Sequence, residues 1–226
     1  MHKTINRLVL VGAILFAVFY FVQGKIDSPD ECEKIAGKWN HDTNTCEQST
    51  SQIIYETLSS GHPIVMRYPE TDIQVILKQS ETVKESHYLK GSYSQKIMIE
   101  NDADKLASYD RGFIYLNMSK MVILNESENG MVHYVAPFVA NTAGSGVFVY
   151  VGLFSYDQKS KKSVYLDFQL LGDRVREETI SYINNHLKVD FKGYEKGQAY
   201  AEYPVERRSL HLQLKNELSN FELIKK

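Results

Sequence analysis

The sequence predicts a mainly β protein, at most α+β, and three observations support this fold class. After Gly61 most apolar residues lie in short runs rich in β-branched and aromatic side chains. Several runs alternate apolar and polar residues, which is typical of a strand with one face in solvent. Polar loops and glycines separate the runs at short intervals. We therefore expect antiparallel strands in a sandwich- or barrel-like body, preceded by a membrane or signal helix and a small disulfide-closed segment.

The N-terminal residues 1–24 have the pattern of a targeting segment. Lys3 and Arg7 precede the apolar run Leu8–Val22, which as a helix would span roughly 22 Å, less than the ~30 Å hydrocarbon core of a bilayer. The length fits a cleaved signal peptide, whereas the aromatic side chains of the run fit an uncleaved signal anchor. Both alternatives stay open. Acidic residues follow the run, so we expect the body outside the cytoplasmic membrane, facing the periplasm, or released if the leader is cleaved.

Residues 25–48 are expected to form a linker segment closed by a disulfide. The chain has two cysteines, Cys32 and Cys46, which lie close together just after the leader. In an exported chain this spacing favours a disulfide, and a loop of about fifteen residues is worth roughly 3 kcal/mol in the chain-entropy model. A metal site is the alternative, but it needs two more ligands and His41 is the one histidine nearby. We expect no metal and no cofactor.

The next part of the chain predicts one short helix and then strands. A weak helical pattern from Ser49 to Ser60 ends at Gly61 and Pro63. Strands are expected at Ile64–Tyr68, Asp72–Lys78, Tyr93–Glu100, Phe113–Met118, Met121–Leu124 and Val132–Asn141. The polar stretch Asn125–Gly130 separates a first β-rich region, residues 49–130, from a second, residues 131–226.

The strongest strand signal lies between Asn141 and Val175. Val147–Phe154 is apolar at nearly every position, which predicts a strand buried on both faces. Ser163–Leu171 alternates, so we expect one apolar and one wet face. The apolar face would carry Val164, Leu166, Phe168 and Leu170. A lysine-rich loop joins the two runs, and we expect their hairpin at the centre of the sheet.

The remaining chain predicts a tight hairpin and a final strand. Thr179–Ile183 and His186–Phe191 flank Asn184-Asn185, and asparagine tolerates the positive φ that a two-residue turn requires. Leu210, Leu212 and Leu214 then alternate with polar residues, which indicates a strand.

Two glycine-containing turns carry a resemblance to a known family. Gly144-Ser145-Gly146 is followed by an aromatic strand, a polar loop and the closing stretch Leu171–Val175. This order resembles the LppP/LprE-type family of bacterial envelope lipoproteins over about residues 131–214. The resemblance implies an exported bacterial β protein and supplies no reaction. The chain departs from the family pattern because no cysteine follows a lipobox, which puts the lipid anchor in question.

Composition and motifs favour a binding protein over an enzyme. All 28 acidic residues follow the leader, so the body is acidic overall and lacks the basic footprint of a nucleic-acid binder. Ser145 lacks the Gly-x-Ser-x-Gly spacing of a nucleophile elbow, and the seven histidines are scattered without zinc-binding spacing. We therefore expect no catalytic residues and a non-enzymatic interaction module. The alternative is a secreted hydrolase whose site assembles from sequence-distant residues.

Four residues around the two turns are candidates for ligand binding: Asn141, Ser145, Asp173 and Arg174. In the functional interpretation Arg174 and its neighbours line a polar pocket for an anionic or sugar ligand. In the structural interpretation Asp173 fixes a turn, while Arg174 packs its stem on the sheet and pairs with a carboxylate. The expected partners are an envelope protein or a glycan, and the membrane if the leader is uncleaved.

Overall fold

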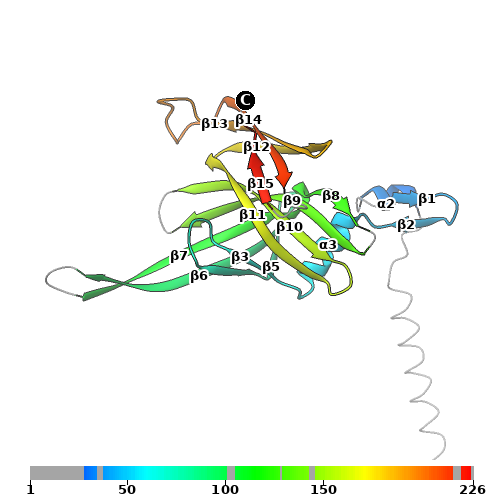
Figure 1. The fold of residues 1–226 in the computed structure, drawn as a ribbon, viewed down its shortest axis with the longest axis horizontal. Coiled ribbons are helices and arrows are strands. Elements are labelled where there is room, and N and C mark those ends of the chain that lie inside the picture. Colours follow the sequence, from blue (N-terminus) through cyan, green and yellow to red (C-terminus); the bar gives the residue numbers. More distant parts are fainter. Residues whose placement is uncertain are drawn as a thin grey trace, which may run out of the picture. The chain divides into compact units, whose positions relative to one another are not determined.

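The computed structural model describes residues 28–34, 38–100, 105–127, 129–142, 146–215 and 220–224. Antiparallel strands dominate these residues (Figure 1), which confirms the mainly β prediction. The chain divides into two compact units, Met1–Gln52 and Ile53–Lys226. None of the helices described is long and apolar enough to cross a bilayer. The predicted leader, residues 1–24, lies outside the described residues.

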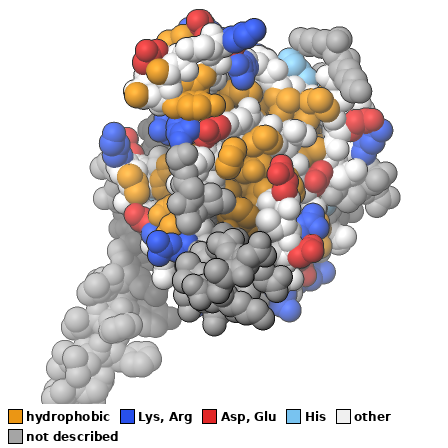
Figure 2. All heavy atoms as spheres, turned by 90° about the vertical axis from the view of Figure 1, so that its left-hand side faces the viewer, with side chains coloured by type: hydrophobic (Ala, Val, Ile, Leu, Met, Phe, Trp, Pro, Cys, Tyr) orange, Lys and Arg blue, Asp and Glu red, His pale blue; other side chains and the backbone are white. Residues whose placement is uncertain are grey.

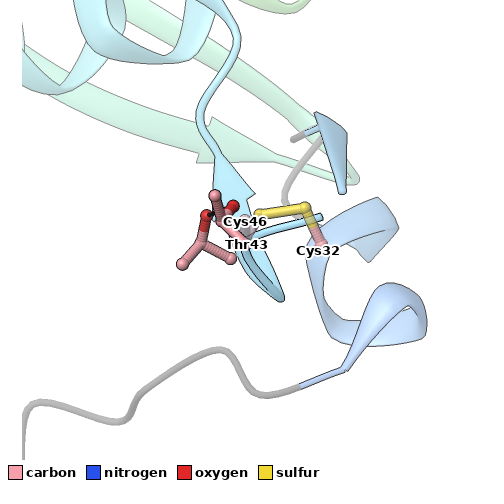
Figure 3. Close-up of a disulfide and its surroundings, with 4 residues drawn as sticks. Cys32, Thr43 and Cys46 are labelled. Carbon is pink, nitrogen blue, oxygen red and sulfur yellow. Dashed lines mark hydrogen bonds between the residues drawn. A yellow bond between two sulfur atoms is a disulfide. The ribbon is translucent and has the colours of Figure 1, made fainter. Parts of the chain in front are cut away.

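In the first unit, one disulfide joins the described helix to a two-stranded sheet. The elements are α2 (Pro29–Lys34), β1 (Lys38–Asn40) and β2 (Thr45–Glu47). Cys32 belongs to α2 and Cys46 to β2, where it lies opposite Trp39 of β1. The two Sγ atoms are 2.02 Å apart (Figure 3). This geometry confirms the predicted pairing of the two cysteines.

A seven-stranded antiparallel sheet forms the middle of the second unit. Its strands are β5 (Gln79–Val83), β6 (Ser86–Glu100), β7 (Lys105–Asn117), β8 (Val122–Glu126), β9 (Met131–Thr142), β10 (Val147–Asp157) and β11 (Lys162–Asp173). The strand order is β11-β10-β9-β7-β6-β5, and β8 also pairs with β9. The two β-rich regions on either side of residue 130 therefore contribute strands to the same sheet, and none of the described sheets closes into a barrel.

A helix and a hairpin cover one face of this sheet. Helix α3 (Thr50–Ser59) begins after Ser49, whose Oγ accepts a hydrogen bond from the Gln52 amide at 3.3 Å. Strands β3 (Ile64–Arg67) and β4 (Gln74–Leu77) pair with each other. The first core lies between these elements and the sheet. It includes Ile54, Leu58, Ile64, Met66, Val75, Leu77, Leu89, Ile114, Phe138 and Phe154.

A four-stranded sheet packs over the opposite face, and its strands follow the sequence order. They are β12 (Arg176–Ile183), β13 (His186–Gly193), β14 (Glu206–Lys215) and β15 (Asn220–Leu223). Asn184 and Asn185 have φ angles of 51° and 64°, so the predicted Asn-Asn turn is confirmed. The second core includes Leu124, Val135, Val149, Val151, Leu153, Leu187, Val189 and Leu212. Strand β10 thus contributes to both cores, as its apolar sequence predicts.

Strand β11 differs from its prediction in position and in side-chain alternation. It forms one edge of the seven-stranded sheet rather than its centre. Phe154 pairs with Tyr165 while Leu153 pairs with Asp167, so Leu166 is an extra residue in a β-bulge. The bulge reverses the alternation: Phe168 packs in the first core and Leu166 in the second. The prediction of a single apolar face for these two residues was therefore wrong.

A close approach between β4 and β6 generates a stability prediction. A Cβ added to Gly91 of β6 would lie 2.4 Å from the carbonyl oxygen of Ile76. We expect Gly91→Ala to lower the free energy of unfolding by about 1–3 kcal/mol, because the hairpin must move away from the sheet. Urea denaturation measures this loss. The neighbouring Ser92→Ala, at an exposed position, should change stability by less than about 0.5 kcal/mol. Equal effects of the two substitutions would contradict the close approach.

Candidate functional site

Three of the four candidate residues meet at Val147, the first residue of β10. The backbone amide of Val147 donates a hydrogen bond to Asp173 Oδ1 at 2.9 Å. The backbone amide of Arg174 donates to the carbonyl of Val147 at 2.7 Å, and Arg174 has a φ of 49°. Asn141 lies opposite Val147 in the β9–β10 register. The fourth candidate, Ser145, lies outside the described residues.

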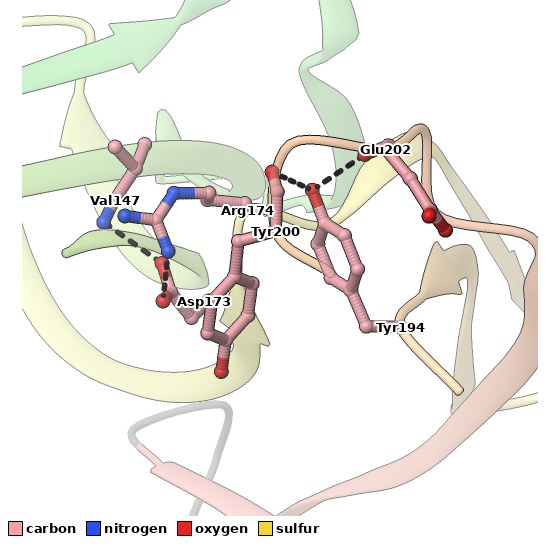
Figure 4. A network of polar contacts seen from close by, with 6 residues as sticks. All are labelled: Val147, Asp173, Arg174, Tyr194, Tyr200 and Glu202. Atoms are coloured by element: carbon pink, nitrogen blue, oxygen red, sulfur yellow. Dashed lines mark hydrogen bonds and ion pairs between the residues drawn. The ribbon is translucent and has the colours of Figure 1, made fainter. Parts of the chain in front are cut away.

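The side chain of Arg174 is held on both sides by its own chain. Its Nη1 donates to Asp173 Oδ2 at 2.6 Å, and its guanidinium carbon lies 4.8 Å from the centre of the Tyr200 ring (Figure 4). The Tyr194 hydroxyl donates to the carbonyls of Tyr200 and Glu202 at 3.2 and 3.1 Å, which fixes the loop that carries Tyr200. These contacts give Asp173 and Arg174 a structural role: together they join the ends of β10 and β11 to the loop 194–205.

Asn141 instead belongs to an exposed part of the sheet. It lies opposite Phe113 of β7, and Ser92 of β6 lies opposite Phe113 on the other side. The amide of Asn141 has no hydrogen bond with any residue that the structure describes. The side chain is half-buried, and an amide can donate and accept hydrogen bonds at once.

A second row of side chains runs beside the first. The first row consists of Ser92, Phe113 and Asn141, which lie opposite one another on β6, β7 and β9. The second row lies two residues further along each strand and consists of Lys90, Tyr115 and Val139. Side chains two apart on a strand share a face, so Asn141 lies on the same side of the sheet as Val139. Arg111, two residues before Phe113, joins this side at an exposed position. We call Lys90, Arg111, Phe113, Tyr115 and Asn141 the aromatic face.

Of the described residues of the four-stranded sheet, Arg176 and Glu178 reach the Tyr115 end of the aromatic face, whereas Phe113 stays exposed. The second core contains residues of β8 to β11 but none of β5, β6 or β7. The Phe113 side chain is 41 % exposed, which is unusual for a large apolar ring. Figure 2 shows one side of the molecule, on which hydrophobic side chains lie next to charged ones. Exposed patches of this kind mark interaction sites on soluble proteins.

The charge on the aromatic face is organised by Lys90. Its ammonium nitrogen lies 5.8 Å from the centre of the Phe113 ring and 4.9 Å from that of Tyr115, within cation–π range. It also forms an ion pair with Glu81 of β5 at 3.6 Å. The Tyr115 side chain raises the pKa of Lys90 most, and Glu81 adds to the rise. The lysine therefore stays charged and holds the two rings in place.

At its inner end the aromatic face leads into a crevice of about 110 Å³. Tyr115 and Val139 form one wall, and Arg176 and Glu178 of β12 form the other. Lys120 fixes this second wall because its ammonium group contacts the Glu178 carboxylate and donates to the Glu178 carbonyl, both at 3.0 Å. The crevice is polar at one side and apolar at the other, so it could receive a small substituent of a larger ligand.

The described residues contain no group of three or more His, Cys, Asp or Glu able to hold a metal ion. Three histidine rings bond to Thr82, to Asn125 and to the carbonyl of Thr57. Burial lowers the pKa of His133, the partner of Asn125. The contact between the Thr82 hydroxyl and His87, at 3.1 Å, spans the exposed β5–β6 hairpin.

No protein-family model matches this chain, and no curated protein or solved structure matches it either. Function therefore has to be argued from the arrangement of the side chains themselves.

Sequence reasoning named Asn141 but missed the rest of the aromatic face. Phe113 and Tyr115 belong to a run that was correctly predicted as a strand, and their spacing of two residues already placed them on one face. The decisive information is the register, which brings Lys90 and Asn141 beside them from strands distant in sequence. The one sequence signal for this face is that aromatic and polar residues occupy every second position of β6 and β7 near Phe113.

The contacts of Asp173 predict a clear difference between two substitutions. Asp173→Ala should lower the free energy of unfolding by about 1–3 kcal/mol, because the Val147 amide loses its acceptor. Asp173→Asn keeps an acceptor oxygen and should cost less. Urea denaturation gives both values, and hydrogen exchange at the Val147 amide reports the bond directly. Equal costs for the two variants, with unchanged exchange at Val147, would contradict the turn-closing role.

Proposed function

We propose that this chain is an exported, non-enzymatic β-rich protein of the bacterial cell envelope that binds a saccharide chain on the aromatic face. The observation that carries the proposal is the exposed Phe113 ring between the amide of Asn141 and the ammonium group of Lys90. An aromatic ring offers an apolar surface to the C–H groups of a sugar. Amide and ammonium groups beside it match the hydroxyl groups of the same sugar.

Export is supported by the N-terminal sequence and by the disulfide. The basic residues before Leu8–Val22 are typical of a signal peptide or signal anchor. The Cys32–Cys46 disulfide fits an oxidising compartment such as the periplasm. The resemblance to the LppP/LprE-type envelope family agrees with this location. We propose a sandwich-like body of stacked sheets, attached to the outer side of the cytoplasmic membrane or released from it.

The shape of the aromatic face favours an extended ligand. The face is a strip of sheet, two rows wide, that ends in the crevice beside Tyr115. A polymer chain can lie along such a strip and place one substituent in the crevice. The ligand class that fits is an envelope polysaccharide, with a binding energy shared among several weak contacts.

The binding role is tested by co-sedimentation of the purified full chain with insoluble envelope polysaccharide. We expect Phe113→Ala to weaken binding about tenfold, equivalent to about 1.4 kcal/mol. Ile183→Ala is the matched control, because Ile183 is 68 % exposed on the β12–β13 hairpin and should leave binding unchanged. Equal weakening by both variants, or unchanged binding of Phe113→Ala, would contradict the proposed site.

Export is tested by the state of the two cysteines in cells. In chain isolated natively from the envelope, Cys32 and Cys46 should resist a thiol-reactive reagent until a reductant is added. A variant lacking residues 1–24 should stay in the cytosol, where thiols are kept reduced, and should react at once. Reactive thiols in the native full-length chain would sink the export proposal.

A further inference from the structure

A cleft lies on the opposite side of the seven-stranded sheet, away from the aromatic face. It measures about 440 Å³ and is bounded by the β3–β4 hairpin and by β11. The outward side of the hairpin presents Arg67 and Gln74, which are direct neighbours in the β3–β4 register. Strand β11 presents Tyr165 and Phe168, which belong to the first core. This volume fits a small organic molecule.

Two opposite charges line the cleft without neutralising each other. Arg67 and Asp72 both have exposed side chains, and neither forms an ion pair with a described residue. Seven other basic side chains of the described residues do pair with carboxylates. The cleft therefore offers one cationic and one anionic group to the same ligand.

The floor of the cleft is formed by two aromatic side chains. The rings of Tyr165 and Phe168 are stacked, with centres 6.2 Å apart and planes at 9°. The Tyr165 hydroxyl is buried and has no hydrogen-bond partner among the described residues. Burial raises its pKa, Asp167 adds to the rise, and the positive charge of Arg67 opposes it. The phenol is thus protonated at neutral pH, and because its oxygen is enclosed by protein atoms, Tyr165 offers its ring to the cleft.

An orphaned hydroxyl in such a place needs a physical reason. A buried donor without a partner costs about 1–3 kcal/mol, and folded proteins keep few of them. The bulge at Leu166 places Tyr165 and Phe168 on the side of the sheet that faces Arg67.

We propose that this cleft binds a zwitterionic small molecule of the amino-acid class with an apolar side chain. Arg67 binds the carboxylate, for which its planar guanidinium is well suited. Asp72 binds the ammonium group. The apolar side chain of the ligand lies against the rings of Tyr165 and Phe168. This site goes beyond the saccharide proposal and uses none of its residues.

Three probes with the same phenyl body separate the two charges. Phenylalanine carries both, 3-phenylpropionate carries only the carboxylate, and 2-phenylethylamine carries only the ammonium group. Isothermal titration of the full-length chain should show phenylalanine binding at least about tenfold more tightly than either analogue. Each analogue lacks one of the two charged groups, so it loses its contact with either Arg67 or Asp72, which is the reason for the weaker binding.

Two charge-removing variants assign each charge to its residue. The Arg67→Gln variant has lost the group that binds the carboxylate, so it should bind phenylalanine only as tightly as it binds 2-phenylethylamine. The Asp72→Asn variant has lost the group that binds the ammonium, so it should bind phenylalanine only as tightly as it binds 3-phenylpropionate. Both residues are exposed, so thermal unfolding should be unchanged and confirm an intact fold. Arg207→Gln, at an exposed position on β14 that does not line the cleft, is the matched control and should bind like the unmodified chain.

The outcomes separate this proposal from the saccharide proposal. Phe113→Ala should leave phenylalanine binding unchanged, because Phe113 lies on the other side of the sheet. Absence of phenylalanine binding at about millimolar concentration, equal binding of the three probes, or tight binding of 3-phenylpropionate alone would overturn the zwitterion site. None of these three results would affect the test of the aromatic face with envelope polysaccharide.

Discussion

Strands β9 and β10 are buried on both faces, and every other layer of the second unit packs against them. The two strands pair without a register shift from Val147–Asn141 to Asp157–Met131. On one side Phe138 and Phe154 enter the first core, and on the other Val149 and Val151 enter the second. Each large apolar side chain buried in this way contributes about 1.5–3 kcal/mol to the free energy of unfolding. This two-sided burial fixes where the helix, the hairpin and the second sheet can lie.

Both proposed sites lie where a covering layer stops short of the edge of the sheet. The four-stranded sheet covers residues of β8 to β11, and the ladder continues past it to β7 and β6. On the other side, the β3–β4 hairpin pairs only with itself and leaves a cleft beside β11. A seven-stranded sheet is wider than either layer. Part of the sheet surface on each side is therefore left uncovered. Its side chains are already in position for a ligand, so neither proposed site needs a loop to move.

Much of the fold could be predicted from local sequence, because alternation and turn residues act over a few positions. The apolar run at Val147–Phe154 and the Asn184-Asn185 turn both have their predicted structures. Strand β5 was missed because all five of its side chains are exposed and carry no apolar pattern. The faces of β11 were predicted wrongly because a bulge at Leu166 leaves no signal in the pattern.

The sites were harder to predict than the strands because their residues meet only through tertiary pairing. Asn141 was recognised beside a conspicuous glycine turn, whereas its neighbours Phe113 and Lys90 come from other strands. Arg67 and Tyr165 are almost one hundred positions apart, and no periodicity connects them. A single sequence reports which residues share a face of one strand. It does not report which strands stand next to one another.

The two outer strands of the large sheet differ in a way that bears on self-association. Strand β5 is short and polar, and Glu81 and Lys90 place charges along it, a common protection of an open sheet edge. Strand β11 is long, and Val164 and Leu170 are 53 % and 39 % exposed along it. The β3–β4 hairpin borders this strand across the cleft and leaves these two side chains exposed. Because apolar side chains already lie at the surface there, aggregation of this protein should begin at β11 rather than at β5.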